Sequence, residues 1–108
     1  MEHETARRTP RYPFVVDVEV SDLLVGIKIV ARTKTLSRCG CGIESALPIA
    51  MGTNVSVRLY HQGGEIVALA RVLYSGPKSG MGIVFTNVDA RNERILELWI
   101  AEQVDQPT

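Results

Sequence analysis

The chain has 108 residues, 45% of them hydrophobic and 22% charged, which is the length and composition of one globular domain. Its 12 basic and 12 acidic residues give a net charge of +0, whereas proteins that bind long nucleic acids usually carry a basic excess. No apolar run is long enough to span a bilayer, and residues 1–11 lack the apolar stretch of a signal peptide. We therefore expect a cytoplasmic protein that neither inserts into a membrane nor binds DNA or RNA.

The first segment, residues 1–12, is polar and shows no apolar periodicity, which indicates a flexible arm. Two prolines near its end disfavour helical angles in the residues before them. Three arginines, Arg7, Arg8 and Arg11, lie in this arm. The arm is therefore expected to be extended or turned, with a strong local positive charge.

Alternating apolar residues then predict a succession of short strands, each with one buried face. The pattern occurs at 14–21, 27–32, 41–45, 54–60 and 81–85, with a turn between Pro48 and Gly52. The sequence Gln-Gly-Gly at 62–64 is a tight hairpin signal. The stretch 66–74 is apolar on both faces, so we expect this strand to be covered on both sides.

The end of the chain changes to a helical period. Asp89 is a candidate N-cap for this helix. Its apolar stripe consists of Ile95, Leu96, Leu98, Trp99, Ile100 and Val104. Short strands with regular turns and one terminal helix predict a mainly β domain, an antiparallel barrel or sandwich, over residues 13–104, followed by a disordered tail at 105–108.

Two short motifs could bind a ligand. The first is the arginine cluster at 7–11, because guanidinium groups donate in a planar fork to phosphate and stack on flat rings. The second is the stretch 35–42, where small residues and glycines suggest a tight turn that lets the backbone come close to another group. The alternatives are a solvated basic tail for the first motif and an ordinary β-turn for the second.

In this order the two motifs resemble the PilZ family, whose signature is Arg-x-x-x-Arg followed by Asp/Asn-x-Ser-x-x-Gly. Arg7 and Arg11 match its first half, and Ser37 and Gly40 match its second half. The later strands and the terminal helix also look like those of the family. The resemblance implies a six-stranded antiparallel PilZ-type β-barrel that receives the bacterial messenger cyclic di-GMP, has no cofactor and performs no catalysis.

The resemblance also implies roles for individual residues. Arg7 and Arg11 would contact phosphate and stack on guanine, with Arg8 assisting. On the barrel, Ser37 and Gly40 would lie against the ligand. Arg38 would lie nearby, and binding would order the arm, which a downstream protein partner would then detect.

One position departs from the family pattern, because Thr35 stands where the family has Asp or Asn. Threonine cannot pair bidentately with a guanine edge, and ligand polar groups left unpaired cost about 1–3 kcal/mol. That corresponds to roughly one to two orders of magnitude in affinity. The departure keeps open a degenerate PilZ domain that acts by protein contact alone. A small barrel that binds single-stranded nucleic acid is a third candidate.

Other chemistry is weakly indicated. Cys39 and Cys41 have Cys-x-Cys spacing, but a zinc site needs about four ligands, and only His3 and His61 could complete it. Metal is therefore not expected. His61 is also the one well-placed base for hydrolysis, although a solvated turn residue is the simpler interpretation.

Overall fold

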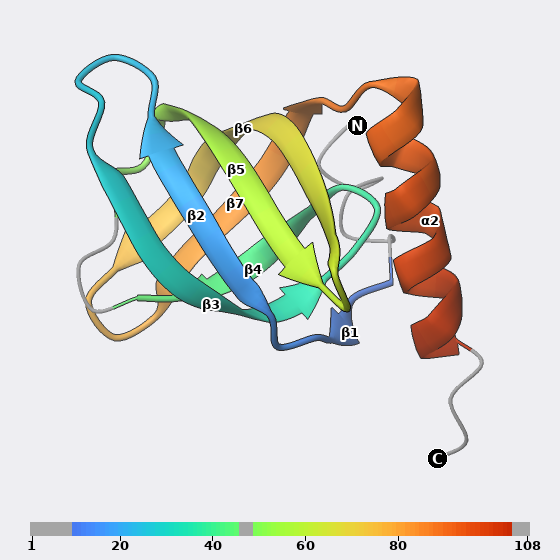
Figure 1. Ribbon diagram of the computed structural model, residues 1–108. Helices are drawn as coiled ribbons and strands as arrows, with labels where there is room; N and C mark the ends of the chain where they lie inside the picture. The colour runs from blue at the N-terminus through green and yellow to red at the C-terminus, as the bar shows by residue number, and fades with distance from the viewer. Residues whose placement is uncertain (1–9, 46–48, 105–108) are drawn as a thin grey trace, which may run out of the picture.

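The structure is a computed structural model that describes residues 10–45 and 49–104. This part of the chain contains seven strands and one helix (Figure 1). The strands are β1 (Tyr12–Pro13), β2 (Asp17–Asp22), β3 (Lys28–Leu36), β4 (Gly40–Glu44), β5 (Asn54–His61), β6 (Gly64–Gly76) and β7 (Gly80–Asn87), and the helix is α2 (Ala90–Val104). Most of the predicted arm, the predicted tail and Pro48 of the predicted turn lie outside the described residues.

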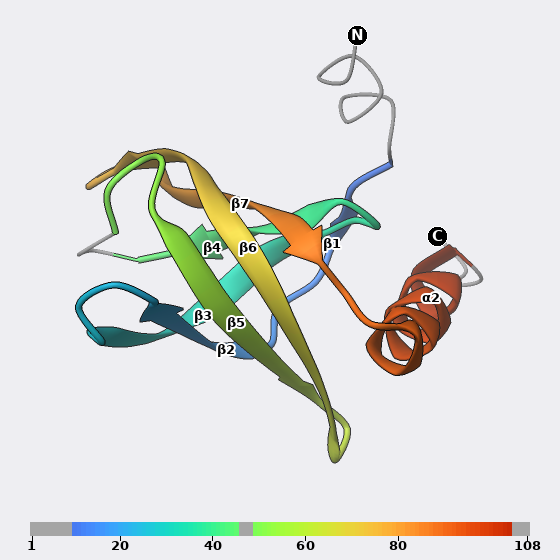
Figure 2. The same cartoon turned by 90° about the horizontal axis from the view of Figure 1, so that it is seen from above.

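Strands β2 to β7 form a closed six-stranded antiparallel barrel, which confirms the predicted fold class. The strand order is β1-β3-β2-β5-β6-β7-β4, and the barrel closes because β3 also pairs with β4. Closure leaves the barrel without a free edge. Seen from above, α2 lies beside the barrel rather than within it (Figure 2).

The core fills the barrel interior, and there the predicted alternation is confirmed. Val18 and Val20 of β2 are fully buried, as are Val57 and Leu59 of β5. The register places Val18 opposite Leu59 and Val20 opposite Val57, so apolar side chains of neighbouring strands share the inner face. Burying one such side chain contributes about 1.5–3 kcal/mol.

The loop between β2 and β3 corrects the predicted start of the second strand. Ile27 was expected to begin a strand, but it is exposed in the loop, and β3 begins at Lys28. The Asp22 carboxylate accepts hydrogen bonds from the N–H groups of Leu24 (2.8 Å) and Val25 (3.2 Å). This side-chain bonding shapes a turn that separates the strands, and it leaves apolar side chains outside at this end of the barrel.

The predicted tight hairpin between β5 and β6 is confirmed. Gln62 has φ 51° and Gly63 has φ 79°, and positive values at both central residues are those of a type I′ turn. The expectation that β6 is covered on both sides is wrong for most of its length. Leu69 and Leu73 are exposed on its outer face, because α2 contacts only part of the strand, where the Asn92 carboxamide oxygen accepts the N–H of Val67 (2.9 Å).

The terminal helix begins where the sequence predicts. The Asp89 carboxylate accepts the backbone N–H of Asn92 at 2.8 Å, which is the N-cap bond. This hydrogen bond is the main reason that the pKa of Asp89 is lowered from its ordinary value. The helix therefore starts from a cap that works best when the carboxyl is ionised.

The buried face of α2 is narrower than predicted. Leu96, Trp99 and Ile100 are buried against the barrel, whereas Leu98 is 65% exposed and Val104 is 58% exposed. One helix on a curved barrel buries only a narrow stripe, so residues at the edge of the predicted stripe turn to solvent. Within the described part of the chain, no helix is long and apolar enough to cross a membrane.

His61 lies under this helix and is not the solvated turn residue that we expected. Its ring packs edge-on against Phe14 (centroids 4.9 Å apart) and Trp99 (5.1 Å). Its Nε2 lies 3.3 Å from a carboxylate oxygen of Glu102 on α2. The histidine therefore helps to join the helix to the barrel.

Candidate functional site

The short strand β1 brings the two sequence motifs together. Tyr12 pairs with Leu36 and Pro13 pairs with Thr35, in antiparallel register. In this register the residue before Tyr12, which is Arg11, comes opposite the residue after Leu36, which is Ser37. The pairing therefore fixes the second arginine of the arm beside the turn that contains the second motif.

Thr33 anchors the segment that follows β1. Its hydroxyl accepts the N–H of Val16 at 3.0 Å and donates to the carbonyl oxygen of Phe14. Backbone bonds join the same strands, from Phe14 N–H to Lys34 O (3.0 Å) and from Thr33 N–H to Val16 O (2.9 Å). These hydrogen bonds hold the segment after β1 against β3, and so they fix the position of Arg11 on the barrel.

The turn between β3 and β4 is shaped by Ser37, whose hydroxyl is occupied by the turn itself. The hydroxyl oxygen accepts the N–H groups of Cys39 (3.1 Å) and Gly40 (3.2 Å), and the hydroxyl lies 3.3 Å from the Gly40 carbonyl, to which it donates. Ser37 is only 6% exposed. Its direct effect is therefore on the backbone, because it holds this turn in one conformation.

Gly40 is required by the close approach of β4 to β7. A Cβ at this position would overlap the carbonyl of Ile83 on β7. Next to it, the Cys39 carbonyl accepts the N–H of Phe85 at 2.7 Å. The glycine thus lets the turn lie directly on β7, which forms one wall of the pocket described below.

A β-bulge in β3 turns Thr35 outward. Thr33 pairs with Ile43 and Thr35 pairs with Gly42, so Lys34 is the extra residue on this strand. Thr33 and Leu36 are both buried, whereas Lys34 and Thr35 lie between them on the outer side. Without the bulge, strict alternation would turn Thr35 toward the interior together with Thr33.

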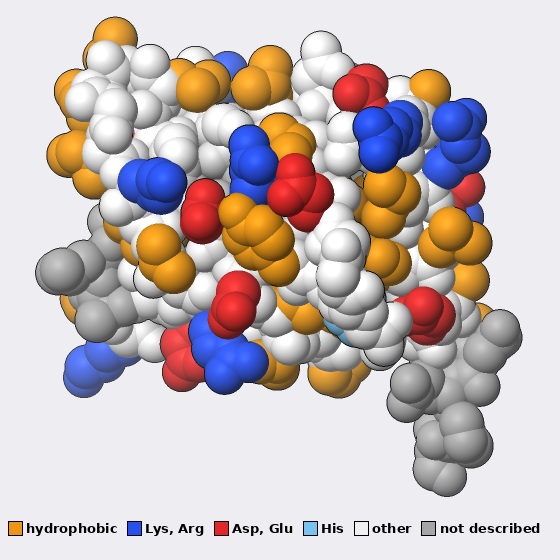
Figure 3. Space-filling view, in the orientation of Figure 1, with side chains coloured by type: hydrophobic (Ala, Val, Ile, Leu, Met, Phe, Trp, Pro, Cys, Tyr) orange, Lys and Arg blue, Asp and Glu red, His pale blue; other side chains and the backbone are white. Residues whose placement is uncertain are grey.

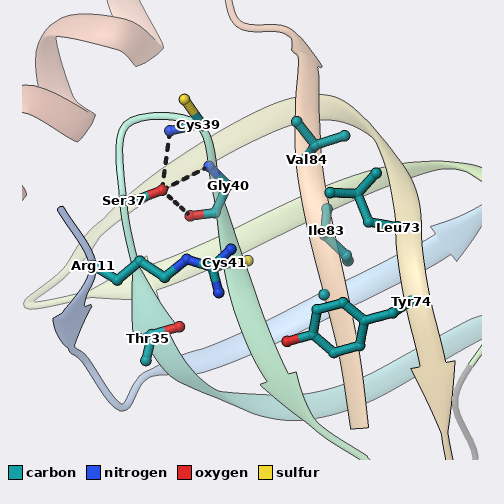
Figure 4. Close-up of a pocket in the computed structure, with 11 residues that line it drawn as sticks. Arg11, Thr35, Ser37, Cys39, Gly40, Cys41, Leu73, Tyr74, Ile83 and Val84 are labelled. Carbon is teal, nitrogen blue, oxygen red and sulfur yellow. Dashed lines mark hydrogen bonds between the residues drawn. The ribbon is translucent and has the colours of Figure 1, made fainter. Parts of the chain in front are cut away.

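Gly42 is buried beneath two hydroxyl groups, those of Thr35 and Tyr74. A Cβ on Gly42 would lie 2.8 Å from the Thr35 hydroxyl and 4.0 Å from the Tyr74 hydroxyl. The Tyr74 ring lies on Gly82, where a Cβ would overlap the ring. Figure 4 shows the guanidinium of Arg11 pointing into the space between the turn, Thr35 and the ring of Tyr74.

These groups form one shallow pocket on the outside of the barrel, with a volume of about 30 Å³. It is lined by Arg11, Thr35, Ser37, Cys39, Gly40, Cys41, Leu73, Tyr74, Gly82, Ile83 and Val84. The lining contains one charged side chain, that of Arg11, and it includes no carboxylate. A hollow of this size holds about one water molecule, so a larger ligand would rest on it and not enter it.

The structure brings together four of the seven predicted site residues, namely Arg11, Thr35, Ser37 and Gly40. Arg38 lies elsewhere, in a separate hollow of about 80 Å³ between the turn and α2, where Glu93 and Glu97 are also found. Arg7 and Arg8 lie outside the described residues, so their predicted contacts stay predictions.

Tyr74 is a site residue that sequence reasoning missed. It lies within the apolar stretch 66–74, which we read as a strand covered on both sides, yet it is 39% exposed and lines the pocket. A signal was present in the sequence, because Tyr74 precedes a glycine-rich loop that is followed by Met-Gly-Ile at 81–83. Glycine in a strand often marks the close approach of another group, and here that group is the ring of Tyr74.

The two cysteines have separate environments. Burial raises the pKa of Cys41 to about 12, so its thiol stays protonated at neutral pH. Cys39 is half-buried on the turn. Across residues 10–45 and 49–104, no group of three or more His, Cys, Asp or Glu side chains could hold a metal ion.

Comparison with known proteins places these features in a family context. The family model for the PilZ domain matches residues 5–102. A crystal structure of the PilZ domain of CeSA from a cellulose-synthesizing bacterium is 25% identical in sequence, with a TM-score of 0.70 over 87% of this chain and 97% of that chain. None of the curated protein sequences compared with this chain matches it.

Two further solved structures share the fold. The PilZ domain of YcgR from Escherichia coli, solved with c-di-GMP, is 21% identical, with a TM-score of 0.72 over 91% of each chain. The inhibitor of motility MotI/DgrA from Bacillus subtilis is 19% identical, with a TM-score of 0.72 over 94% of this chain and 53% of that chain.

Proposed function

This chain belongs to the PilZ domain family, and on that premise we propose that it is a receptor domain that binds cyclic di-GMP in bacterial second-messenger signalling. The observation that carries the proposal is the β1–β3 register, which fixes Arg11 opposite Ser37 and over Thr35. Arg11 of the first half of the family signature thereby lies beside Ser37 and Gly40 of the second half, on one outer face of the barrel. The complex of the YcgR PilZ domain with c-di-GMP supports the choice of ligand.

The pocket offers several groups that can contact such a ligand. Arg11 supplies a guanidinium for phosphate or for stacking on a base. The Tyr74 ring offers an aromatic face or edge, and stacking of a base on an aromatic ring is worth about 1–3 kcal/mol. The hydroxyls of Thr35 and Tyr74 can donate to or accept from polar groups of the ligand.

We propose a receptor and not an enzyme. Histidine and carboxylate side chains are frequent general bases in enzymes, and the described lining of the pocket holds neither. The shallow hollow leaves much of a bound dinucleotide uncovered. We expect the arm that contains Arg7 and Arg8 to cover the exposed part of the ligand. Ordering of this arm would be the signal that a protein partner detects.

The test is a calorimetric titration of the full chain with cyclic di-GMP, with GTP and cyclic di-AMP as competitors. Arg11→Ala should weaken binding by at least about tenfold, because a hydrogen bond to a charged group contributes about 1.5–3 kcal/mol. Arg58→Ala is the matched control, since Arg58 is exposed on β5, lies 3.2 Å from Glu65 and does not line the pocket. Absence of heat with wild-type protein at about tens of micromolar ligand would refute the proposal and leave the alternative of a domain that acts by protein contact alone.

A further inference from the structure

We propose that Lys34 is a second phosphate-binding group of this site, placed by the β-bulge at the end of the pocket away from the Ser37 turn. The inference rests on the proposed function, because its ligand is one of the two phosphates of the same dinucleotide. Lys34 belongs to neither half of the family signature described above. Three features of the structure support it, and they are independent of the signature.

The first feature is the direction of the side chain. As the extra residue of the bulge, Lys34 shares the outer side of β3 with Thr35, which lines the pocket. Its Nζ donates to the carbonyl oxygen of Ser79 at 3.2 Å. Ser79 directly precedes Gly80, whose position abuts the carbonyl of Ile43 on β4. The lysine chain therefore reaches from β3 across β4 to the start of β7.

The second feature is a row of residues across the barrel surface, beside the ammonium group of Lys34. Thr35 pairs with Gly42, Gly42 pairs with Gly82, and Gly82 pairs with Tyr74, so these four residues cross four neighbouring strands in one line. Lys34 precedes Thr35 at one end of this line. A ligand that rests on Thr35 and Tyr74 would have Arg11 on the side of the turn and Lys34 on the side of the β6–β7 loop.

The third feature is electrostatic. Three other basic side chains on the barrel lie beside a carboxylate: Lys28 beside Glu19 (3.7 Å), Arg32 beside Asp17 (3.7 Å) and Arg58 beside Glu65 (3.2 Å). Figure 3 shows this mixture of basic and acidic side chains over β2, β3 and β5.

Lys34 differs from these three residues, because its bonded partner is a neutral carbonyl, as that of Arg71 is a neutral carboxamide, and within the described residues no carboxylate lies within 4.0 Å of it. Replacing that carbonyl by a phosphate oxygen would give a charge-assisted bond, which is about twice as strong. The structure thus leaves a positive charge available at the place where the second phosphate of a ligand held by Arg11 would need one.

The experiment compares Lys34→Gln, Lys34→Arg and Lys28→Gln in the calorimetric titration with cyclic di-GMP. Lys28 is the matched control, because it lies on the same strand and its substitution removes the same charge, but it is already paired with Glu19. We expect Lys34→Gln to weaken binding about 5- to 20-fold, after allowance for solvent exposure. Lys34→Arg should stay within about threefold of wild type, and Lys28→Gln within about twofold. Equal affinity of Lys34→Gln and wild type, or an equal loss in Lys28→Gln, would overturn the inference.

A second arm separates this inference from the proposed function. Inorganic pyrophosphate has no base, so it probes the anion site alone, and its binding can be followed by backbone amide NMR. In the wild type, we expect pyrophosphate to shift the amide signals of Ser79 and Thr35, and in Lys34→Gln we expect these shifts to be lost. The other amide signals of Lys34→Gln show whether the variant is folded. If the wild-type protein fails to bind cyclic di-GMP in the calorimetric titration, that result refutes the proposed function. The role of Lys34 is then decided by the pyrophosphate titration. Absence of pyrophosphate shifts at these residues would refute the role of Lys34.

Discussion

Replacement of Gly40 by alanine should test whether the glycine of the signature serves the fold or the ligand. The Cβ of an alanine at this position would overlap the carbonyl of Ile83. That carbonyl belongs to the backbone of β7, which is held by pairing with both β4 and β6. The overlap cannot be relieved by a rotating side chain, so the two strands would have to move apart.

The expected cost can be estimated from the energetics of overpacking. An extra carbon in a well-packed site costs about 1–3 kcal/mol, and we expect the upper end here because the obstacle is backbone. With a urea m-value of about 1–3 kcal/mol per molar, Gly40→Ala should lower the unfolding midpoint by about 1–2 M. Gly64→Ala is the matched control, since its Cβ would meet the His61 carbonyl at 3.5 Å, an ordinary contact.

Urea unfolding followed by Trp99 fluorescence measures both variants. We expect Gly64→Ala to change the free energy of unfolding by less than about 1 kcal/mol. Equal midpoints for the two variants would refute the claim that β4 and β7 need a glycine at this position. Loss of ligand binding in a Gly40→Ala protein of unchanged stability would instead assign this glycine to ligand contact.

Three further predictions concern single residues. Thr35→Asp should tighten cyclic di-GMP binding about 10- to 100-fold and increase selectivity over cyclic di-AMP, measured by competition titration, because a carboxylate can pair with a guanine edge; unchanged affinity would show that this position does not face a base. Asp89→Ala should lower the melting temperature at neutral pH. Because the folded pKa of Asp89 is depressed, its stabilisation is present above the ordinary value of 3.8 and is lost as the pH falls through the folded value; the gap between variant and wild type should therefore narrow in acid, and a constant gap would contradict the cap. Cys41 should resist a thiol reagent until the protein unfolds, because burial raises its pKa to about 12; labelling of Cys41 in folded protein, detected by mass spectrometry, would contradict its burial.

The barrel could be predicted from the sequence because its elements depend on local patterns. Alternation in β2 and β5 follows directly from one buried face, the hairpin at 62–64 follows from its glycines, and the Asp89 cap follows from the position of a carboxylate before an apolar helical stripe. Each of these features needs only neighbouring residues. The grouping of Arg11, Thr35, Ser37 and Gly40 was expected from the family resemblance and not from the pattern of the residues.

The features that were missed depend on contacts between distant segments. The bulge at Lys34 can be recognised only from the pairing of β3 with β4, since the sequence of β3 does not reveal which residue is unpaired. Tyr74 becomes a pocket residue because Gly82 on the next strand leaves room for its ring. In the same way, His61 is enclosed because α2 returns to cover it with Trp99.

The role of Ser37 also differs from a simple reading of the signature. Its hydroxyl is occupied by the N–H groups of Cys39 and Gly40, so the serine acts through the shape of the turn. A substitution that keeps the hydroxyl, Ser37→Thr, and one that removes it, Ser37→Ala, would differ mainly in the order of the turn. This distinction between shaping a site and touching a ligand could not be made from the sequence.

The most direct measurement is an amide NMR titration of the whole chain with cyclic di-GMP, combined with a search for contacts between guanine H8 and the Tyr74 ring. If the messenger lies on the pocket beside Thr35 and Tyr74, the amide signals of Gly40, Cys41 and Gly82, which line the pocket, should shift together, and the ring contact should be detected. Shifts confined to Gly26 and Gly52, which lie in loops that do not line the pocket, would place the ligand on another face and contradict the proposed site.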